Sequence, residues 1–197
     1  MNVAKEPHPI DLAVVAVHAN QLQAEGIEFA IFKSDKDVLT LQVARDAGVT
    51  EGDGVFALGF PMGLVGKERN YVIVRQGAIA RIRDAFARVS NDILVDISVF
   101  PGNSGGPLIM RPEVTAIQGT NALSRSMLIG VVASYIPYQD VAVSIQTGHR
   151  RIVFQENSGL ASVIPVDHVV VLHELNLKAW ADRGVETIGP VPKGATV

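Results

Sequence analysis

Short apolar segments of four to six residues alternate with turn residues along most of this chain of 197 residues. Such segments, rich in Val, Ile and Phe and bounded by Gly, Pro, Asn or Asp, are typical of the strands of an all-β barrel or sandwich. We predict strands at residues 12–17, 27–32, 38–43, 54–59, 71–75, 78–83, 93–96, 107–110, 128–133 and 160–164. One helix is predicted after Pro165, where Asp167 is placed to cap the first turn. The sequence therefore predicts an all-β fold with a C-terminal helix.

The composition is that of a well-packed globular protein, because 48% of the residues are hydrophobic and only 19% are charged. A net charge of −3 without a basic run gives no reason to expect nucleic acid or an anionic membrane surface as a partner. The lack of cysteine excludes disulfides and thiolate metal sites, and leaves cytoplasm and periplasm both open. No signal peptide and no apolar run of about 20 residues can be read, so we expect a soluble protein.

A single serine, Ser104, stands among three glycines and two prolines in the stretch FPGNSGGPLI, residues 100–109. Glycines permit backbone conformations that other residues avoid, so the stretch predicts a tight, irregular loop that presents the serine hydroxyl. If Gly102 and Ser104 turn their N–H groups into the space beside that hydroxyl, the two donors can hold a developing oxyanion. The loop then provides half of an acyl-transfer site. The alternative is an ordinary glycine-rich turn whose serine caps the turn or faces solvent.

Six segments in the same order resemble the trypsin-like serine peptidases, and in detail the cysteine-free bacterial branch that includes the HtrA-type proteases. They are IDLAVVAV, EGDGVFALGFPMGL, VRQGAIARI, LVDISVFPGNSGGPLI, LIGVVASY and SGLASVIPVDHV. The resemblance implies a serine endopeptidase that acts on peptide or protein substrates without a cofactor. No HExxH motif and no carboxylate cluster with ligand spacing occurs in the sequence, so no metal site is predicted. HtrA-type enzymes usually carry a PDZ module, and no such module follows in this sequence.

The fold that this resemblance implies is a chymotrypsin-like double β-barrel, with the catalytic residues in the cleft between the barrels. Here the resemblance begins just before the triad aspartate of the family, which implies that the first barrel is incomplete. Residues 1–48 would be the remnant of the first barrel, residues 49–165 the second barrel with the nucleophile loop, and residues 166–197 the C-terminal helix and tail.

The resemblance assigns Ser104 as the nucleophile, the N–H groups of Gly102 and Ser104 as the oxyanion hole, and Asp11 as the carboxylate that orients the imidazole. No histidine can be assigned as the base. His18 lies seven positions after Asp11 on the same predicted strand, which separates the two by about 23 Å. His8 precedes a proline and is read as a surface residue in a turn. The remaining histidines are His149 in a variable loop and His168 and His173 on the predicted helix.

Three explanations of the missing histidine are open. An upstream segment that carries the missing strands and the histidine is the one we favour, because an incomplete barrel would expose sheet edges. The second is a degenerate, catalytically inactive protease that binds peptides without cleaving them and acts as an interaction protein. The third is that another chain supplies the missing strands, in an oligomer. Removal of the base costs on the order of a millionfold in turnover, so the chain as written is expected to be nearly inactive.

The resemblance also places the substrate-binding cleft. The base of the primary pocket is expected at Ser98, six residues before the nucleophile, and its adjacent wall at Val132, Ala133, Ser134 and Tyr135. No acidic residue stands at the base position, so small or medium apolar side chains are predicted at the cleaved position. Asn103 stands where many secreted members have an aspartate that pairs with a newly cut N-terminal amine. Because an amide cannot form that ion pair, no activation by N-terminal cleavage is predicted.

Overall fold

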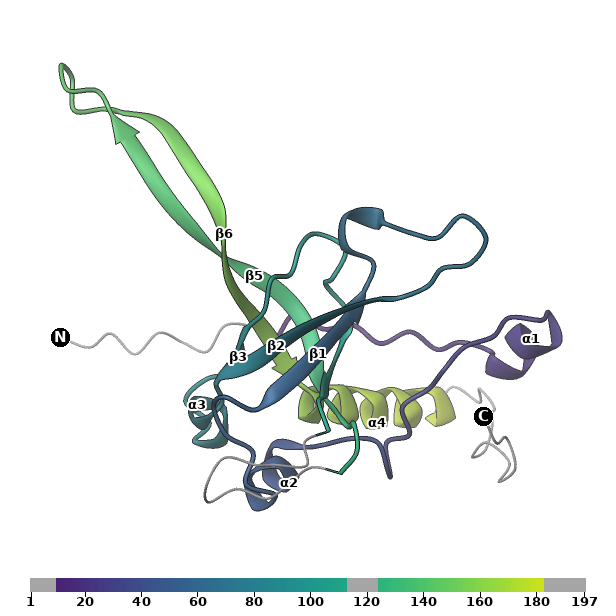
Figure 1. Cartoon of the computed structure of the whole chain (residues 1–197). Helices are drawn as coiled ribbons and strands as arrows, with labels where there is room; N and C mark the ends of the chain where they lie inside the picture. Colours follow the sequence, from purple (N-terminus) through teal and green to yellow (C-terminus); the bar gives the residue numbers. More distant parts are fainter. Residues whose placement is uncertain (1–9, 113–123, 183–197) are drawn as a thin grey trace.

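The computed structural model describes residues 10–112 and 124–182, and its central feature is a closed barrel of six antiparallel strands (Figure 1). The strands are β1 (Gly54–Gly59), β2 (Ile73–Arg81), β3 (Ile93–Asp96), β4 (Pro107–Met110), β5 (Leu128–Val143) and β6 (Arg150–Pro165). Around the barrel their order is β1-β2-β3-β6-β5-β4, and β4 pairs back with β1. The strands predicted at 54–59, 93–96 and 107–110 are confirmed. The described residues form one barrel, and the second barrel of the predicted pair stays a prediction.

The barrel interior is formed by alternate, mostly apolar side chains of its strands. Val55 and Ala57 of β1 are fully buried, and so are Val95 of β3 and Val163 of β6. Successive residues of a strand face opposite sides of the sheet, so this alternation supplies one continuous interior. Burial of these side chains is the main source of stability in a chain without disulfides.

A single strand, β2, stands where the sequence predicts two. Gly77 was expected to separate strands at 71–75 and 78–83, but it lies inside β2 and pairs with Val55 of β1. A Cβ atom at Gly77 would lie 2.3 Å from the carbonyl oxygen of Asp96 and 2.7 Å from the Cβ atom of Ile97. The glycine therefore allows a close approach of the neighbouring chain and does not mark a turn.

The strands predicted at 12–17, 27–32 and 38–43 are wrong. The described residues before the barrel hold only the helices α1 (Ala19–Ala24) and α2 (Leu41–Asp46), and Val38 makes an isolated bridge to Leu128. Alternating apolar side chains are present in this part, but many of them are exposed: Ile10, Val15, Val17, Ile27, Phe29, Ile31 and Phe32. A strand needs a partner for its backbone groups, and apart from the bridge at Val38 no described strand pairs with this part of the chain. The domain boundary at residue 48 stays a prediction.

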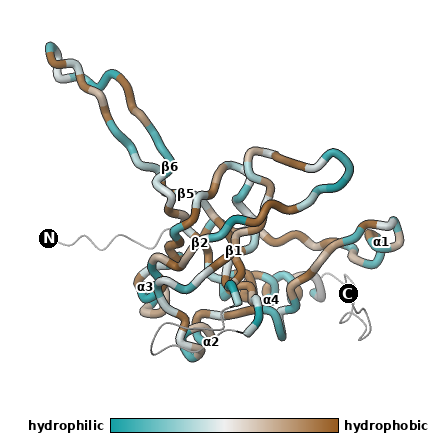
Figure 2. Tube along the Cα trace, viewed as in Figure 1, coloured by the Kyte–Doolittle hydropathy of each residue, from teal (hydrophilic) through white to brown (hydrophobic). Residues whose placement is uncertain are grey.

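The strands β5 and β6 are much longer than the predicted strands at 128–133 and 160–164. Their ends near the barrel complete its wall, and their far halves pair only with each other and form a two-stranded ribbon that projects from the barrel (Figure 1). Figure 2 shows hydrophobic positions continuing along this ribbon. The segment read as a variable loop around His149 is therefore a hairpin.

The C-terminal helix is confirmed as α4 (Val166–Asp182), which lies below the barrel in Figure 1. Its Asp167 carboxylate accepts a hydrogen bond from the backbone N–H of Leu41 at 2.9 Å. This carboxylate oxygen therefore binds the first turn of α2. The sequence predicts a cap only for the helix that carries Asp167. No helix in the described part of the chain is both long and apolar enough to cross a membrane.

A glutamate side chain fixes the short helix α3 (Arg83–Phe86) to the barrel. The Glu51 carboxylate accepts hydrogen bonds from the N–H groups of Ile82 at 3.1 Å and Arg83 at 3.2 Å, and from the Thr50 hydroxyl at 3.2 Å. Partial burial raises the pKa of Glu51, but these backbone and hydroxyl donors outweigh it and hold the pKa below its ordinary value.

The lowered pKa makes the contribution of Glu51 to stability dependent on pH. A carboxylate with a depressed folded pKa stabilises the fold above its unfolded pKa, and this contribution is lost as the pH falls through the folded pKa. We expect Glu51→Gln to lower the free energy of unfolding by about 1 kcal/mol at neutral pH and by much less at an acidic pH below the folded pKa of Glu51. Denaturant unfolding at both pH values measures this, with the exposed Glu174→Gln as control. An equal loss at both pH values would contradict it.

Candidate active site

The serine predicted as nucleophile lies on an exposed turn between β3 and β4. Gly102 and Gly105, on either side of Ser104, have φ angles of +97° and +82°, a region that favours glycine. The turn is closed by hydrogen bonds from the N–H of Asn103 to the Phe100 carbonyl and from the N–H of Gly106 to the Asn103 carbonyl, each 2.9 Å long. The two glycines thus let the chain reverse sharply and leave the Ser104 side chain exposed to solvent.

Strand β5 holds one side of this loop. The N–H of Gly105 donates to the Val132 carbonyl at 2.8 Å, and the N–H of Val132 donates to the Gly106 carbonyl at 2.9 Å. The Ser104 hydroxyl donates to the carbonyl oxygen of Ala133 at 2.9 Å. Ala133 therefore contributes its backbone to the site, and the orientation of the Ser104 side chain is set by β5.

The turn after β1 holds the other side of the loop. Met62, in the short 3-10 helix η1 (Pro61–Gly63), donates its N–H to the Pro101 carbonyl at 2.6 Å. A Cβ atom at Gly102 would lie 2.3 Å from the carbonyl oxygen of Phe60, so the two chains touch through their backbones. The segment EGDGVFALGFPMGL thus ends in a turn that supports the loop carrying Ser104.

Asn103 organises the loop from below. Its side chain is 1% exposed, and its Oδ1 atom accepts a hydrogen bond from the N–H of Phe100 at 3.0 Å. Its Nδ2 atom is buried without a hydrogen-bond partner among the described residues, close to the backbone of Gly59. The asparagine therefore acts as an internal brace for the turn, a role that the sequence comparison with secreted members did not suggest.

The two amide groups predicted as the oxyanion hole are available as donors. Within residues 10–112 and 124–182, neither the N–H of Gly102 nor that of Ser104 takes part in a hydrogen bond. Their neighbours Asn103, Gly105 and Gly106 all donate to carbonyl groups and are therefore occupied. Both N–H groups are thus free of acceptors among the described residues, and their pairing as an oxyanion hole stays a prediction.

A cavity of about 210 Å³ opens beside the serine. Its lining is mostly apolar and comes from both sides of the loop and from β5: Val99, Phe100, Pro101, Asn103, Ser104, Val132, Ser134 and Tyr135. Three predicted substrate-binding residues, Val132, Ser134 and Tyr135, thus meet Ser104 at one cavity. Ser98 instead lines a separate hollow of about 480 Å³ together with Asp96 and Arg111.

A cation lies behind one wall of this cavity, which the sequence did not reveal. The Arg75 guanidinium stands over the Phe100 ring, 4.9 Å from its centroid. Arg75 lies on β2, and its Nε atom is buried without a partner among the described residues. The contact is within the range of cation–π attraction. Only the closed barrel brings β2 to the loop before the serine, so no sequence motif signals this pair.

Among residues 10–112 and 124–182, neither the predicted carboxylate nor a histidine forms a hydrogen bond with Ser104, whose hydroxyl donates to the Ala133 carbonyl. Asp11 is exposed in a part of the chain without regular structure, and His18 directly precedes α1, which lies well away from the barrel in Figure 1. His149 lies at the tip of the ribbon, His168 and His173 lie on α4, and His8 falls outside the described residues. The roles of Asp11 and of a base therefore stay predictions. No three His, Asp or Glu side chains of the described part group as they would around a metal ion.

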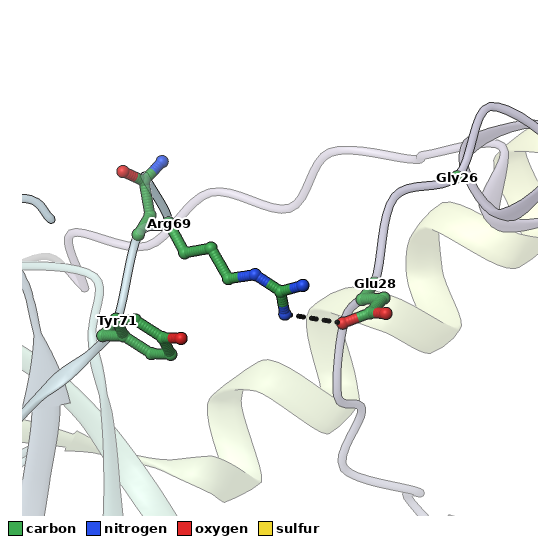
Figure 3. Close-up of a pocket in the computed structure, with 5 residues that line it drawn as sticks. Gly26, Glu28, Arg69 and Tyr71 are labelled. Carbon is green, nitrogen blue, oxygen red and sulfur yellow. Dashed lines mark ion pairs between the residues drawn. The ribbon is translucent and has the colours of Figure 1, made fainter. Parts of the chain in front are cut away.

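A further hollow, of about 510 Å³, lies between the N-terminal part of the chain and the loop that joins β1 to β2 (Figure 3). Arg69 and Glu28 form an ion pair across it at 3.5 Å, and Tyr71 and Gly26 complete its lining with Asn70. Both charged side chains are more than half exposed, and such a pair contributes little to stability. Ser104 does not line this hollow.

Comparison with known families identifies the class of protein. Residues 2–115 match the family model of the trypsin-like peptidase domain, a span that covers more than half of the chain and ends just after the Ser104 loop. No curated protein matches the chain. The barrel, the loop and this match agree, and the chain belongs to the trypsin-like peptidase domain family. Membership supports a protease-type function in general.

Proposed function

We propose that this protein is a serine endopeptidase of the HtrA-like branch that hydrolyses peptide bonds through an acyl-enzyme on Ser104. The proposal rests on three features of one loop. The Ser104 hydroxyl is exposed, the N–H groups of Gly102 and Ser104 have no acceptor among the described residues, and an apolar cavity opens beside the serine. An alcohol nucleophile beside two amide donors is the arrangement that acyl transfer requires.

In the proposed reaction, the Ser104 oxygen attacks the carbonyl carbon of the substrate and the two N–H groups stabilise the oxyanion that forms. An imidazole takes the serine proton and returns it to the leaving amine, and Asp11 orients that imidazole. We place the imidazole on a further segment, upstream in the same chain or on a partner chain. The exposed apolar side chains before residue 37 support this, because additional strands would cover them.

The cavity beside Ser104 favours small or medium apolar side chains at the cleaved position. Its walls are mostly hydrocarbon, and the Arg75 guanidinium behind Phe100 adds a positive potential. A lysine or arginine side chain of the substrate would lose its hydration in this cavity and meet a like charge. Apolar substrate side chains meet neither penalty.

A second candidate function is peptide binding without cleavage, as an interaction protein. The hydrogen bond from the Ser104 hydroxyl to the Ala133 carbonyl favours it, because this bond holds the hydroxyl proton away from a base. A peptide can still occupy the cavity in that state, since the cavity does not depend on the proton of Ser104. The two candidates differ only in whether Ser104 reacts.

Covalent labelling separates the candidates. Peptidyl phosphonates that carry valine or lysine at the position bound in the cavity are reacted with this chain, with a form extended upstream in the reading frame, and with Ser104→Ala of each. We expect the extended form to react with the valine probe and this chain to react on the order of a millionfold more slowly. Ser104→Ala should abolish the reaction, and the lysine probe should react at least about tenfold more slowly than the valine probe. Peptide binding without labelling of any form would overturn the endopeptidase proposal.

A further inference from the structure

The far half of the ribbon formed by β5 and β6 has two open edges. Residues 137–143 of β5 pair with residues 150–157 of β6. The neighbouring barrel strands, β4 and β3, pair only with the halves of β5 and β6 that lie in the barrel wall, which we call the base of the ribbon. On that base, β4 pairs with β5 at 128–131 and β3 pairs with β6 at 160–163. An isolated two-stranded ribbon is at best marginally stable in water, and an unpaired edge is a template for another strand.

The two edges are not equivalent, because the β5 edge is blocked. Pro137 has no N–H group to donate, and the N–H of Val141 is bound by the side chain of its neighbour, Asp140, at 2.8 Å. Proline and inward-turned charge are the devices with which natural sheets prevent strand addition. Between Arg150 and Glu156, the β6 edge has neither a proline nor a glycine.

The hydrogen bond of Val141 also shows which way the groups of β6 point. Val141 lies directly opposite Val153. In an antiparallel ladder the two residues of a pair either bond to each other or both turn their N–H and C=O groups outward. Because the N–H of Val141 is bound to Asp140 and not to β6, the pair is of the outward kind. Val153 therefore presents its N–H and C=O groups to the open edge of β6.

The sequence along this edge is complementary to itself. It reads RRIVFQE over residues 150–156, with two arginines at one end, one glutamate at the other and three apolar residues between them. The three apolar side chains are each more than half exposed: Ile152 by 55%, Val153 by 53% and Phe154 by 53%. Among the described residues, neither the arginines nor Glu156 forms an ion pair. The charges of this segment are thus unsatisfied within the chain.

We propose that the β6 edges of two copies of this chain pair antiparallel about a two-fold axis at Val153, so that two ribbons become one four-stranded sheet. In that register Val153 exchanges both of its outward hydrogen bonds with Val153 of the second copy. Ile152 lies opposite Phe154 of the second copy, a favourable pair of a β-branched and an aromatic side chain. Arg150 of each copy lies opposite Glu156 of the other, at both ends of the interface, and Arg151 lies opposite Gln155. The partner that this edge fits is therefore a second copy of the chain.

Charge reversal tests this register in the full chain by sedimentation velocity over a series of concentrations. The unchanged protein is expected to be a dimer. Glu156→Arg, and separately Arg150→Glu with Arg151→Glu, should each weaken the dimer by about 100-fold, because each sets like charges together at both ends. An equimolar mixture of the two variants should form a dimer again, because opposite charges then meet at both ends. Glu174→Arg, an exposed charge change on α4, is the control and should leave the dimer intact.

The mixture makes the test independent of folding, since a variant that fails to fold cannot be restored by another variant. Circular dichroism of each variant should match that of the unchanged protein. A monomer of the unchanged protein at every concentration would overturn the proposal. Dimers of both reversal variants alone, or two monomers that stay apart on mixing, would overturn it as well. A complex of the unchanged protein larger than a dimer would show that a different surface associates.

Discussion

Gly102→Ala is expected to lower the rate of phosphonate labelling at Ser104 by at least about 100-fold, in the form of the protein that labels. Two physical effects combine at this position. The φ angle of Gly102 is +97°, which an alanine adopts only with strain, and the new Cβ atom would lie 2.3 Å from the Phe60 carbonyl oxygen. Neither the backbone of Phe60 nor that of Gly102 can yield without moving the N–H proposed for the oxyanion hole.

The neighbouring Gly105→Ala is a matched control for this variant. Its φ angle is +82°, but a Cβ atom there would have nothing within 4 Å. Gly105→Ala should therefore cost only the strain, about 1 kcal/mol of the free energy of unfolding. Gly102→Ala should cost about 2 to 4 kcal/mol, since the clash adds to the strain. Denaturant unfolding of both variants measures the difference. Equal labelling rates for the two would show that the position of Gly102 does not matter for the reaction.

The barrel could be predicted from the sequence because its signals are local. At β1, β3 and β4, a short alternating apolar run is bounded by turn residues, and the expected and observed bounds coincide. The same local signal is present at Phe29 and Ile31, yet no strand forms there. A strand depends on a partner elsewhere in the chain, and a window of a few residues contains no information on whether that partner exists.

The candidate site was predictable to the same extent. The glycines around Ser104 are a local signal, and the structure gives both Gly102 and Gly105 the positive φ angles that such a signal implies. The cavity wall formed by Phe100 and the Arg75 cation behind it depend on the closure of the barrel. The spacing of the strands along the sequence therefore predicts neither the Phe100 wall nor its contact with Arg75. The length of the ribbon has no such local signal, because the sequence around His149 resembles a variable loop.

Leu108→Ala is expected to lower the free energy of unfolding by about 3 kcal/mol, within the range for a leucine truncated in a rigid core. Leu108 lies on β4 and is fully buried, opposite Ala57 of β1 and Gly130 of β5. Both of these partners are small, and the two backbones are fixed in the barrel ladder, so the surroundings cannot collapse into the space that the leucine leaves.

Ile109→Ala provides the comparison, because it removes a similar side chain from the next residue, which faces the other side of the sheet and is only half-buried. We expect its cost to be about 1 kcal/mol, since less apolar surface returns to water and no enclosed cavity forms. Denaturant unfolding at neutral pH measures both variants. A loss for Leu108→Ala no larger than that for Ile109→Ala would mean that β4 does not close the barrel. The loop that carries Ser104 would then lack the strand that fixes its C-terminal end.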